Sequence, residues 1–178
     1  MERVKQGEQK AFRLLFDQYK GPIMSYLYHM VRNPKLAEDL TQETFFKVYR
    51  FRDKYEPQSK FTAWLWTIAR NTALDHFRGE KDLNTVASNE EVLDTIVDSA
   101  PGSEAQLIES ADRERVNHCI AGLTTAQRDA LLLRTMSELS YDEIAAQMKL
   151  SLSSIKSLIN RAKAGLMRCI GGAEASYE

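Results

Sequence analysis

Residues 140–166 read SYDEIAAQMKLSLSSIKSLINRAKAGL, and their spacing predicts two short helices joined by a tight turn. Ser140 and Glu143 have the S-x-x-E spacing of a capping box, in which each side chain satisfies a backbone donor at the start of a helix. The expected turn begins at Lys149, and Ser151 can cap the second helix. We expect the second helix to bury its regularly spaced apolar residues, which are Ile155, Leu158, Ile159, Ala162 and Leu166.

The outward positions of the second helix carry hydrogen-bond donors. Every charged residue between positions 144 and 170 is basic. Such side chains contact phosphates and base edges, so the pattern predicts a helix-turn-helix that reads DNA. The alternative is an ordinary amphipathic helix pair with a solvated face, which the single sign of the charge disfavours. The candidate DNA contacts are Ser154, Lys156, Ser157, Asn160, Arg161 and Lys163.

The composition indicates an all-α protein without metal or cofactor. Only eight glycines and four prolines occur in 178 residues, and apolar positions recur at helical spacing, so we expect two small helical domains. Cys119 and Cys169 are far apart and lack metal-ligand spacing, so we expect two unpaired thiols in a reducing compartment. No apolar run has the length of a membrane span, and the N-terminus lacks the apolar segment of a signal peptide. A soluble, cytoplasmic chain is therefore expected.

The N-terminal part of the sequence predicts long helices over residues 8–30, 36–51 and 61–78. Pro22 marks a candidate interruption of the first. Residues expected to be buried include Tyr49 in the second helix, whereas the burial of Trp66 in the third is left open. The third helix also carries an aromatic and aliphatic stripe that we interpret as core rather than as a base-stacking platform; its members are Phe61, Trp64, Leu65 and Ile68.

A stretch of sequence without helical periodicity separates two domains. Residues 82–104 contain six acids and no base, which predicts a flexible acidic linker. A helix over residues 104–121 should follow, with Val116 among its inward residues. A second capping box at Thr124 and Gln127 predicts the next helix. The expected division is a first domain over 1–81, a linker over 82–103, a second domain over 104–172 and a tail over 173–178.

Three blocks of this sequence, in this order, resemble the extracytoplasmic-function (ECF) group of bacterial sigma factors. They are EDLTQETFFKVY at 38–49, KFTAWLWTIARNTALD at 60–75, and LSYDEIA at 139–145 followed by the second helix of the helix-turn-helix. The resemblance implies sigma regions 2 and 4, which bind the −10 and −35 promoter elements. It also implies an alternative sigma factor that binds the β′ clamp and β flap of core RNA polymerase, helps to melt promoter DNA and is restrained by an anti-sigma factor.

The resemblance assigns roles to residues of the first domain. Carboxylates on the second helix would meet basic residues of the clamp, although spacing alone also fits a solvated helix face. Asn71 matches the position that reads a flipped −10 base, and Tyr55 matches an aromatic residue lining that pocket. Leu158 departs from the family, where many relatives have Arg. The clamp candidates are Asp39, Gln42 and Glu43, and the −10 candidates are Tyr55, Lys60, Arg70, Asn71 and Arg78.

Two other functions compete with this interpretation. A stand-alone helix-turn-helix regulator would dimerise and bind duplex DNA without polymerase. An enzyme would need a catalytic cluster, and His29, His76 and His118 are isolated in the sequence. The formal net charge of −1 predicts weak DNA binding by the chain alone, because affinity for DNA depends on phosphate neutralisation.

Overall fold

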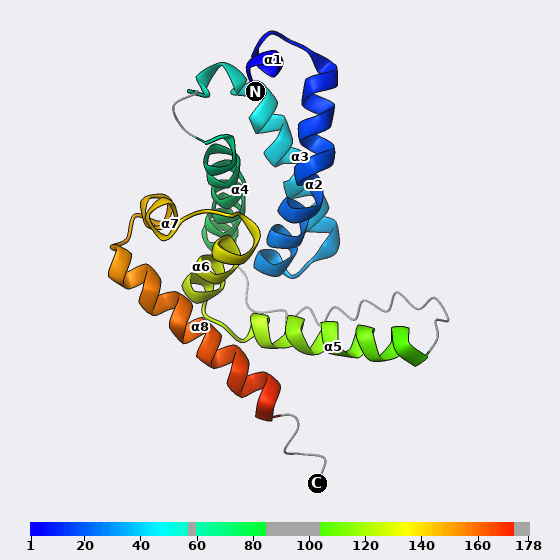
Figure 1. The fold of residues 1–178 in the computed structure, drawn as a ribbon, viewed down its shortest axis with the longest axis vertical. Coiled ribbons are helices and arrows are strands. Elements are labelled where there is room, and N and C mark those ends of the chain that lie inside the picture. The colour runs from blue at the N-terminus through cyan, green and yellow to red at the C-terminus, as the bar shows by residue number, and fades with distance from the viewer. Residues whose placement is uncertain (57–59, 85–103, 173–178) are drawn as a thin grey trace.

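The computed structural model describes residues 1–56, 60–84 and 104–172, and the regular structure in these ranges is helical throughout. This confirms the all-α prediction for the described part of the chain, whereas most of the predicted linker and the tail lie outside it. Figure 1 shows the elements in chain order. They are α1 (Glu2–Lys5), α2 (Gln9–Val31), α3 (Pro34–Arg50), the 3-10 turn η1 (Arg52–Lys54), α4 (Phe61–Asn84), α5 (Glu104–Ala121), α6 (Thr125–Met136), α7 (Tyr141–Met148) and α8 (Leu152–Gly172).

The N-terminal half, α1 to α4, is built around the packed helices α2, α3 and α4 (Figure 1). Helix α3 starts where the sequence can satisfy its free backbone donors: the side chain of Asn33 accepts a hydrogen bond from the Leu36 N–H at 2.9 Å, and Pro34 follows the cap. Phe16 and Phe45 pack edge to face across α2 and α3, with ring centroids 4.8 Å apart. Apolar faces of the three helices thereby form one core.

Four details of the helices differ from the prediction. Helix α2 continues through Pro22 because Ile23 and Leu27, which follow it, are fully buried and their tertiary packing offsets the missing hydrogen bond. Tyr49 is 36% exposed and lies under the Arg52 guanidinium rather than in the core. Helix α4 runs beyond residue 78 to Asn84, and Val116 on α5 is 40% exposed. Trp66, whose burial was open, is only 1% exposed.

The C-terminal half, α5 to α8, contains the expected helix-turn-helix in α7 and α8. Both predicted capping boxes are formed, the first at Thr124 and Gln127 and the second at Ser140 and Glu143. Lys149 ends α7 with a φ of 56°, a left-handed conformation that reverses the chain within a few residues. The apolar stripe of α8 packs inward, most completely at Ile155, Ile159 and Ala162.

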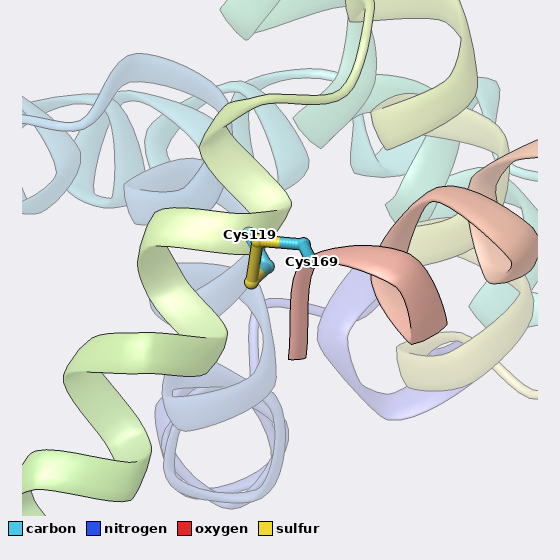
Figure 2. Close-up of a disulfide and its surroundings, with 2 residues drawn as sticks. All are labelled: Cys119 and Cys169. Atoms are coloured by element: carbon cyan, nitrogen blue, oxygen red, sulfur yellow. A yellow bond between two sulfur atoms is a disulfide. The ribbon is translucent and has the colours of Figure 1, made fainter. Parts of the chain in front are cut away.

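A disulfide between Cys119 of α5 and Cys169 of α8 corrects the expectation of two unpaired thiols. The Cα atoms are 5.7 Å apart, and Figure 2 shows the bond joining the two helices. Fifty residues separate the pair in sequence, so only the packing of α5 against α8 brings the thiols together. Cys119 is buried and Cys169 is exposed.

The two halves contact each other. Helix α6 packs against α2, and a single apolar cluster contains Ile23 and Leu65 from the N-terminal half together with Leu132 and Ile144 from the C-terminal half. The sequence predicted domains whose relative placement was free. In this structure they share a seam, which places residues of α6 and α7 beside α4.

Candidate nucleic-acid interface

Helix α8 presents a polar face to solvent. Its inward stripe fixes the rotation of the helix, because Ile155 and Ile159 are completely buried. The Nε of Arg161 donates a hydrogen bond to the backbone carbonyl of Ser157 at 3.3 Å, and the two terminal nitrogens of the guanidinium take no part in this bond. Five of the six predicted −35 residues are exposed on this face, namely Lys156, Ser157, Asn160, Arg161 and Lys163.

The sixth residue, Ser154, lies half-buried at the start of α8. Its backbone N–H donates to the Ser151 hydroxyl at 3.2 Å, and the two hydroxyls lie 2.8 Å apart. Ser151 therefore caps the helix as the sequence predicted. The arrangement places hydroxyls and free backbone donors at the positive end of the helix dipole, which suits a phosphate contact.

The acidic face of α3 is also exposed. Asp39, Gln42 and Glu43 all face solvent, and the Glu43 carboxylate pairs with Lys47 at 2.7 Å. Next to them lies Phe46, which is 63% exposed and which the sequence reasoning did not single out. The sequence pattern that could have identified Phe46 is its spacing: it follows Glu43 by three residues and Gln42 by four, which places it on the same helix face. An exposed aromatic ring flanked by acids is typical of a surface that binds a basic protein partner.

The predicted −10 residues do not share one open surface. Asn71 and Arg78 are exposed, and Arg78 pairs with Asp75 at 3.1 Å. Tyr55 is only 7% exposed because its ring packs against Trp64, with centroids 5.5 Å apart. The tyrosine therefore belongs to an aromatic cluster that supports the start of α4.

The other two predicted −10 residues, Lys60 and Arg70, pair with acids of the C-terminal half. Lys60 Nζ lies 3.2 Å from the Glu143 carboxylate, although the lysine side chain stays 68% exposed. Arg70 is more enclosed: its side chain is 14% exposed, and its Nε donates to Asp129 at 2.7 Å. Its Nη1 also donates to the backbone carbonyl of Gln147 at 3.1 Å. Sequence reasoning missed Asp129, since its partners are distant in the chain.

Burial dominates the electrostatics around Asp129. It raises the pKa of the Asp129 carboxyl above its ordinary value, and the Arg70 guanidinium and the Tyr26 hydroxyl oppose that rise. Burial together with the nearby carboxylate raises the pKa of Tyr26 well above its usual range. The Tyr26 hydroxyl therefore stays protonated, and it donates a hydrogen bond to the Asp129 carboxylate at 2.9 Å. In contrast, the pKa of Glu143 is lowered, first by the hydrogen bond from the Ser140 backbone N–H.

Two kinds of site are absent from the described ranges. Residues 1–56, 60–84 and 104–172 hold no group of three or more metal-ligating side chains. Within the same part of the chain, no helix is both long and apolar enough to cross a bilayer.

Comparison with known proteins agrees with this geometry. The family model of Sigma-70 region 2 matches residues 15–82, and that of Sigma-70, region 4 matches residues 113–166. RNA polymerase sigma factor CarQ of Myxococcus xanthus is 33% identical over 98% of this chain and 97% of its own. ECF RNA polymerase sigma factor BldN of Streptomyces coelicolor is 34% identical over 96% of this chain and 64% of its own.

A solved structure has the same arrangement of helices. It is the sigma factor RpoE of Bartonella quintana in complex with the anti-sigma factor NepR, with a TM-score of 0.73, 26% identity, and coverage of 91% of this chain and 98% of that one. The sequence matches span both halves, and the structural match covers the fold. The chain belongs to the sigma-70 family of RNA polymerase sigma factors, in its ECF group.

Proposed function

We propose that this chain directs core RNA polymerase to promoters by reading the −10 element with α4 and the −35 element with α8. The observation that carries the proposal is the exposed donor face of α8, in a chain that matches both sigma region 2 and region 4. Amide and guanidinium groups such as those of Asn160 and Arg161 suit base edges in the major groove. The chain acts by binding rather than as an enzyme, and it works in the cytoplasm, where its polymerase is found.

Asn71 is the residue we assign to −10 recognition. It is exposed on α4, and an amide can donate to and accept from the Watson-Crick edge of an unpaired base. Holding such a base outside the stack is the step that melting requires. Tyr55 then supports the start of α4 from its aromatic cluster. We assign Arg78 and Lys60, which are both exposed, to the backbone of the DNA.

Asp39, Gln42 and Glu43 form the surface that we assign to the β′ clamp. Two carboxylates beside the exposed Phe46 ring combine electrostatic steering with an apolar contact. The C-terminal half would meet the β flap. A similar sigma factor, RpoE, has been solved with an anti-sigma factor, and we propose that this chain also has such a partner.

Reconstitution with sigma-free bacterial core polymerase tests the proposal. The purified chain is added to core polymerase and a library of promoter fragments, and the transcripts are sequenced. We expect transcription that depends on the chain and starts at a shared pair of −35 and −10 motifs. Binding of a homodimer to a palindrome without polymerase, together with no transcription, would overturn the proposal in favour of a stand-alone regulator.

A further inference from the structure

The Cys119–Cys169 disulfide joins the last turns of α5 and α8 (Figure 2), and its two ends differ in exposure. Helix α5 ends at Ala121 and α8 ends at Gly172, so each cysteine lies within a few residues of a helix terminus. Cys119 is 3% exposed, whereas Cys169 is exposed to solvent. Thiol–disulfide exchange needs an accessible sulfur. A small thiol or disulfide in solution can therefore reach this pair at Cys169 rather than at Cys119.

Only a small apolar cluster supports the end of α8 beside the disulfide. Leu166 packs against three buried residues, which are Leu123, Leu131 and Ala162. Met167, which follows Leu166, is 76% exposed, and Val116 on α5 is 40% exposed. Segments with few buried apolar contacts open easily. The last turns of α8 therefore depend on the covalent bond to α5.

A disulfide in this position fits a reversible bond better than a permanent one. Cytoplasmic thiols keep structural disulfides rare, and the disulfides that do form there usually serve catalysis or redox sensing. Exposed disulfides are also more readily reduced than buried ones. The cytoplasmic setting rests on the proposed function, whereas the exposure of Cys169 is a property of the structure.

The charges on α8 favour an anionic reactant at Cys169. Arg168 precedes the cysteine and is exposed, Lys163 is exposed earlier on the helix, and no acid occurs from Leu152 to Gly172. Helix α5 carries charges of both signs, so the basic character comes from α8. A positive surface raises the local concentration of an anion. Glutathione disulfide, in which carboxylates outnumber amines, has the charge that suits this surface.

We propose that Cys119 and Cys169 form a reversible thiol–disulfide exchange site, which anionic small disulfides such as glutathione disulfide oxidise through Cys169. The Cys169 thiolate attacks one sulfur of glutathione disulfide, whose S–S bond breaks; a mixed disulfide forms, and one glutathione thiolate leaves and takes up a proton. The Cys119 thiolate then attacks the Cys169 sulfur and releases the second glutathione, which is protonated likewise. Two electrons thus pass from the protein thiols to glutathione disulfide, and reduced glutathione reverses both steps.

Oxidation of the pair fixes the end of α8 against α5. The helix carries the exposed polar face that the proposed function gives to the −35 element, and Lys163 on that face lies six residues before Cys169. Reduction leaves the small cluster around Leu166 to hold the last turns of α8. The oxidised chain is therefore the form that holds its proposed −35 surface more rigidly, and it binds promoter DNA more tightly.

Equilibration of the full chain with glutathione tests the exchange. The free wild-type chain is held at a series of ratios of reduced to oxidised glutathione, starting from either redox form. The free thiols are then alkylated and counted by mass spectrometry. We expect the disulfide fraction to follow the ratio and to reach the same value from both directions. A pair that stays fully oxidised, or fully reduced, at every ratio would overturn the proposal.

Single variants identify the sulfur that reacts first. Cys119→Ser keeps the exposed Cys169 and should form the mixed disulfide about tenfold faster than Cys169→Ser, which keeps the buried Cys119. Circular dichroism checks that both variants fold, and equal rates in the folded variants would contradict entry through Cys169. If a variant does not fold, brief treatment of the reduced wild type gives the same answer: glutathione should be found on Cys169, and glutathione on Cys119 would overturn the proposal.

The response to salt tests the charge of the reactant. Added salt should slow the reaction of the reduced chain with glutathione disulfide about threefold and should speed up the reaction with cystamine, a small disulfide that carries amines. Arg168→Gln should weaken both responses. If salt has no effect, or the opposite effect, the assignment to anionic disulfides is wrong.

Promoter binding with core polymerase measures the consequence. The oxidised chain should bind promoter DNA about threefold more tightly than the reduced chain. Cys119→Ser/Cys169→Ser is the matched control, since it should not respond to the glutathione ratio and it corrects for thiols of the polymerase. Equal responses of the wild type and the control would overturn the effect on promoter binding. The two proposals fail differently: absence of transcription refutes the proposed function, whereas exchange measured on the free chain tests the cysteine pair alone.

Discussion

The two helices that we propose to contact DNA, α4 and α8, differ in how accessible their basic side chains are. On α8, Arg161 is exposed, and its Nε donates to the Ser157 carbonyl of its own helix at 3.3 Å. On α4, Arg70 is 14% exposed and ion-paired with a residue 59 positions away. The proposed −35 surface is thus open in this structure, whereas part of the proposed −10 surface is covered by the other half of the chain. The comparison teaches that the same fold leaves basic residues of α8 accessible while it pairs Arg70 of α4 with a buried acid.

The distribution of charge explains this difference. Between residues 144 and 170 the sequence has no acid, so no carboxylate on α8 itself neutralises its basic face. Two acids of the C-terminal half, Asp129 and Glu143, pair with Arg70 and Lys60 across the seam. In this nearly neutral chain, the basic face of α8 therefore stays exposed, whereas basic residues at α4 are paired with acids.

The largest effect that we predict is on the stability of the helix pair α5 and α8, which carries the exposed polar face. The Cys119–Cys169 disulfide closes a loop of 50 residues, and its removal should lower the free energy of unfolding by about 4 kcal/mol in the chain-entropy account. Denaturant unfolding of the wild type and of Cys119→Ser/Cys169→Ser, each with and without reductant, measures this. Equal midpoints for the oxidised wild type and the double variant would show that the crosslink does not support α8.

The next effect tests the part of α4 that stays exposed. Asn71→Ala should slow promoter opening about 10- to 100-fold, which corresponds to roughly 1–3 kcal/mol for one unpaired base. Affinity for core polymerase should not change, since the surface proposed to bind the clamp belongs to α3, whereas Asn71 belongs to α4. Permanganate footprinting of the melted region and a polymerase binding assay measure the two quantities. Equal losses in both assays would refute the assignment.

A smaller effect is expected from single contacts on α8. Arg161→Ala should weaken promoter binding by the polymerase complex about tenfold and reduce the dependence on salt, because one phosphate or base contact is lost. Arg168→Ala is the matched control, since it removes the same charge from an exposed position on the same helix outside the predicted contacts. Filter binding at several salt concentrations measures both. If the two variants lose equal affinity, α8 acts only through its overall charge.

The smallest predicted effect is a dependence of stability on pH at the seam. Burial and the Arg128 guanidinium lower the pKa of His29, so the folded chain holds that proton less well than the unfolded chain does. Unfolding therefore takes up a proton, and stability should fall as the pH drops below about 6.5, the ordinary pKa of histidine. Thermal melts of the wild type and His29→Gln between pH 7.5 and 5.5, roughly the range in which histidine titrates, test this. The melting temperature of His29→Gln should fall less steeply with decreasing pH than that of the wild type. A steeper fall in the variant would contradict the role of His29.

Sequence patterns predicted the structural features that involve residues close together in the chain. The capping boxes at Ser140 and Thr124 and the apolar stripe of α8 involve residues only a few positions apart, and the structure confirms them. The disulfide and the Tyr26–Asp129 hydrogen bond join residues 50 and 103 positions apart, and such pairs leave no periodic trace. The sequence alone therefore assigned Arg70 to DNA without revealing its partner. The roles of the predicted DNA-contacting residues stay predictions.

Chemical modification of arginine most directly tests the central claim that the proposed −10 surface is partly covered while the proposed −35 surface is open. The free wild-type chain is treated with phenylglyoxal, and mass spectrometry follows the modification rates of Arg70 and Arg161. We predict rapid modification of Arg161, slow modification of Arg70, and faster modification of Arg70 in Asp129→Asn. Equal rates for the two arginines in the wild type would contradict the account.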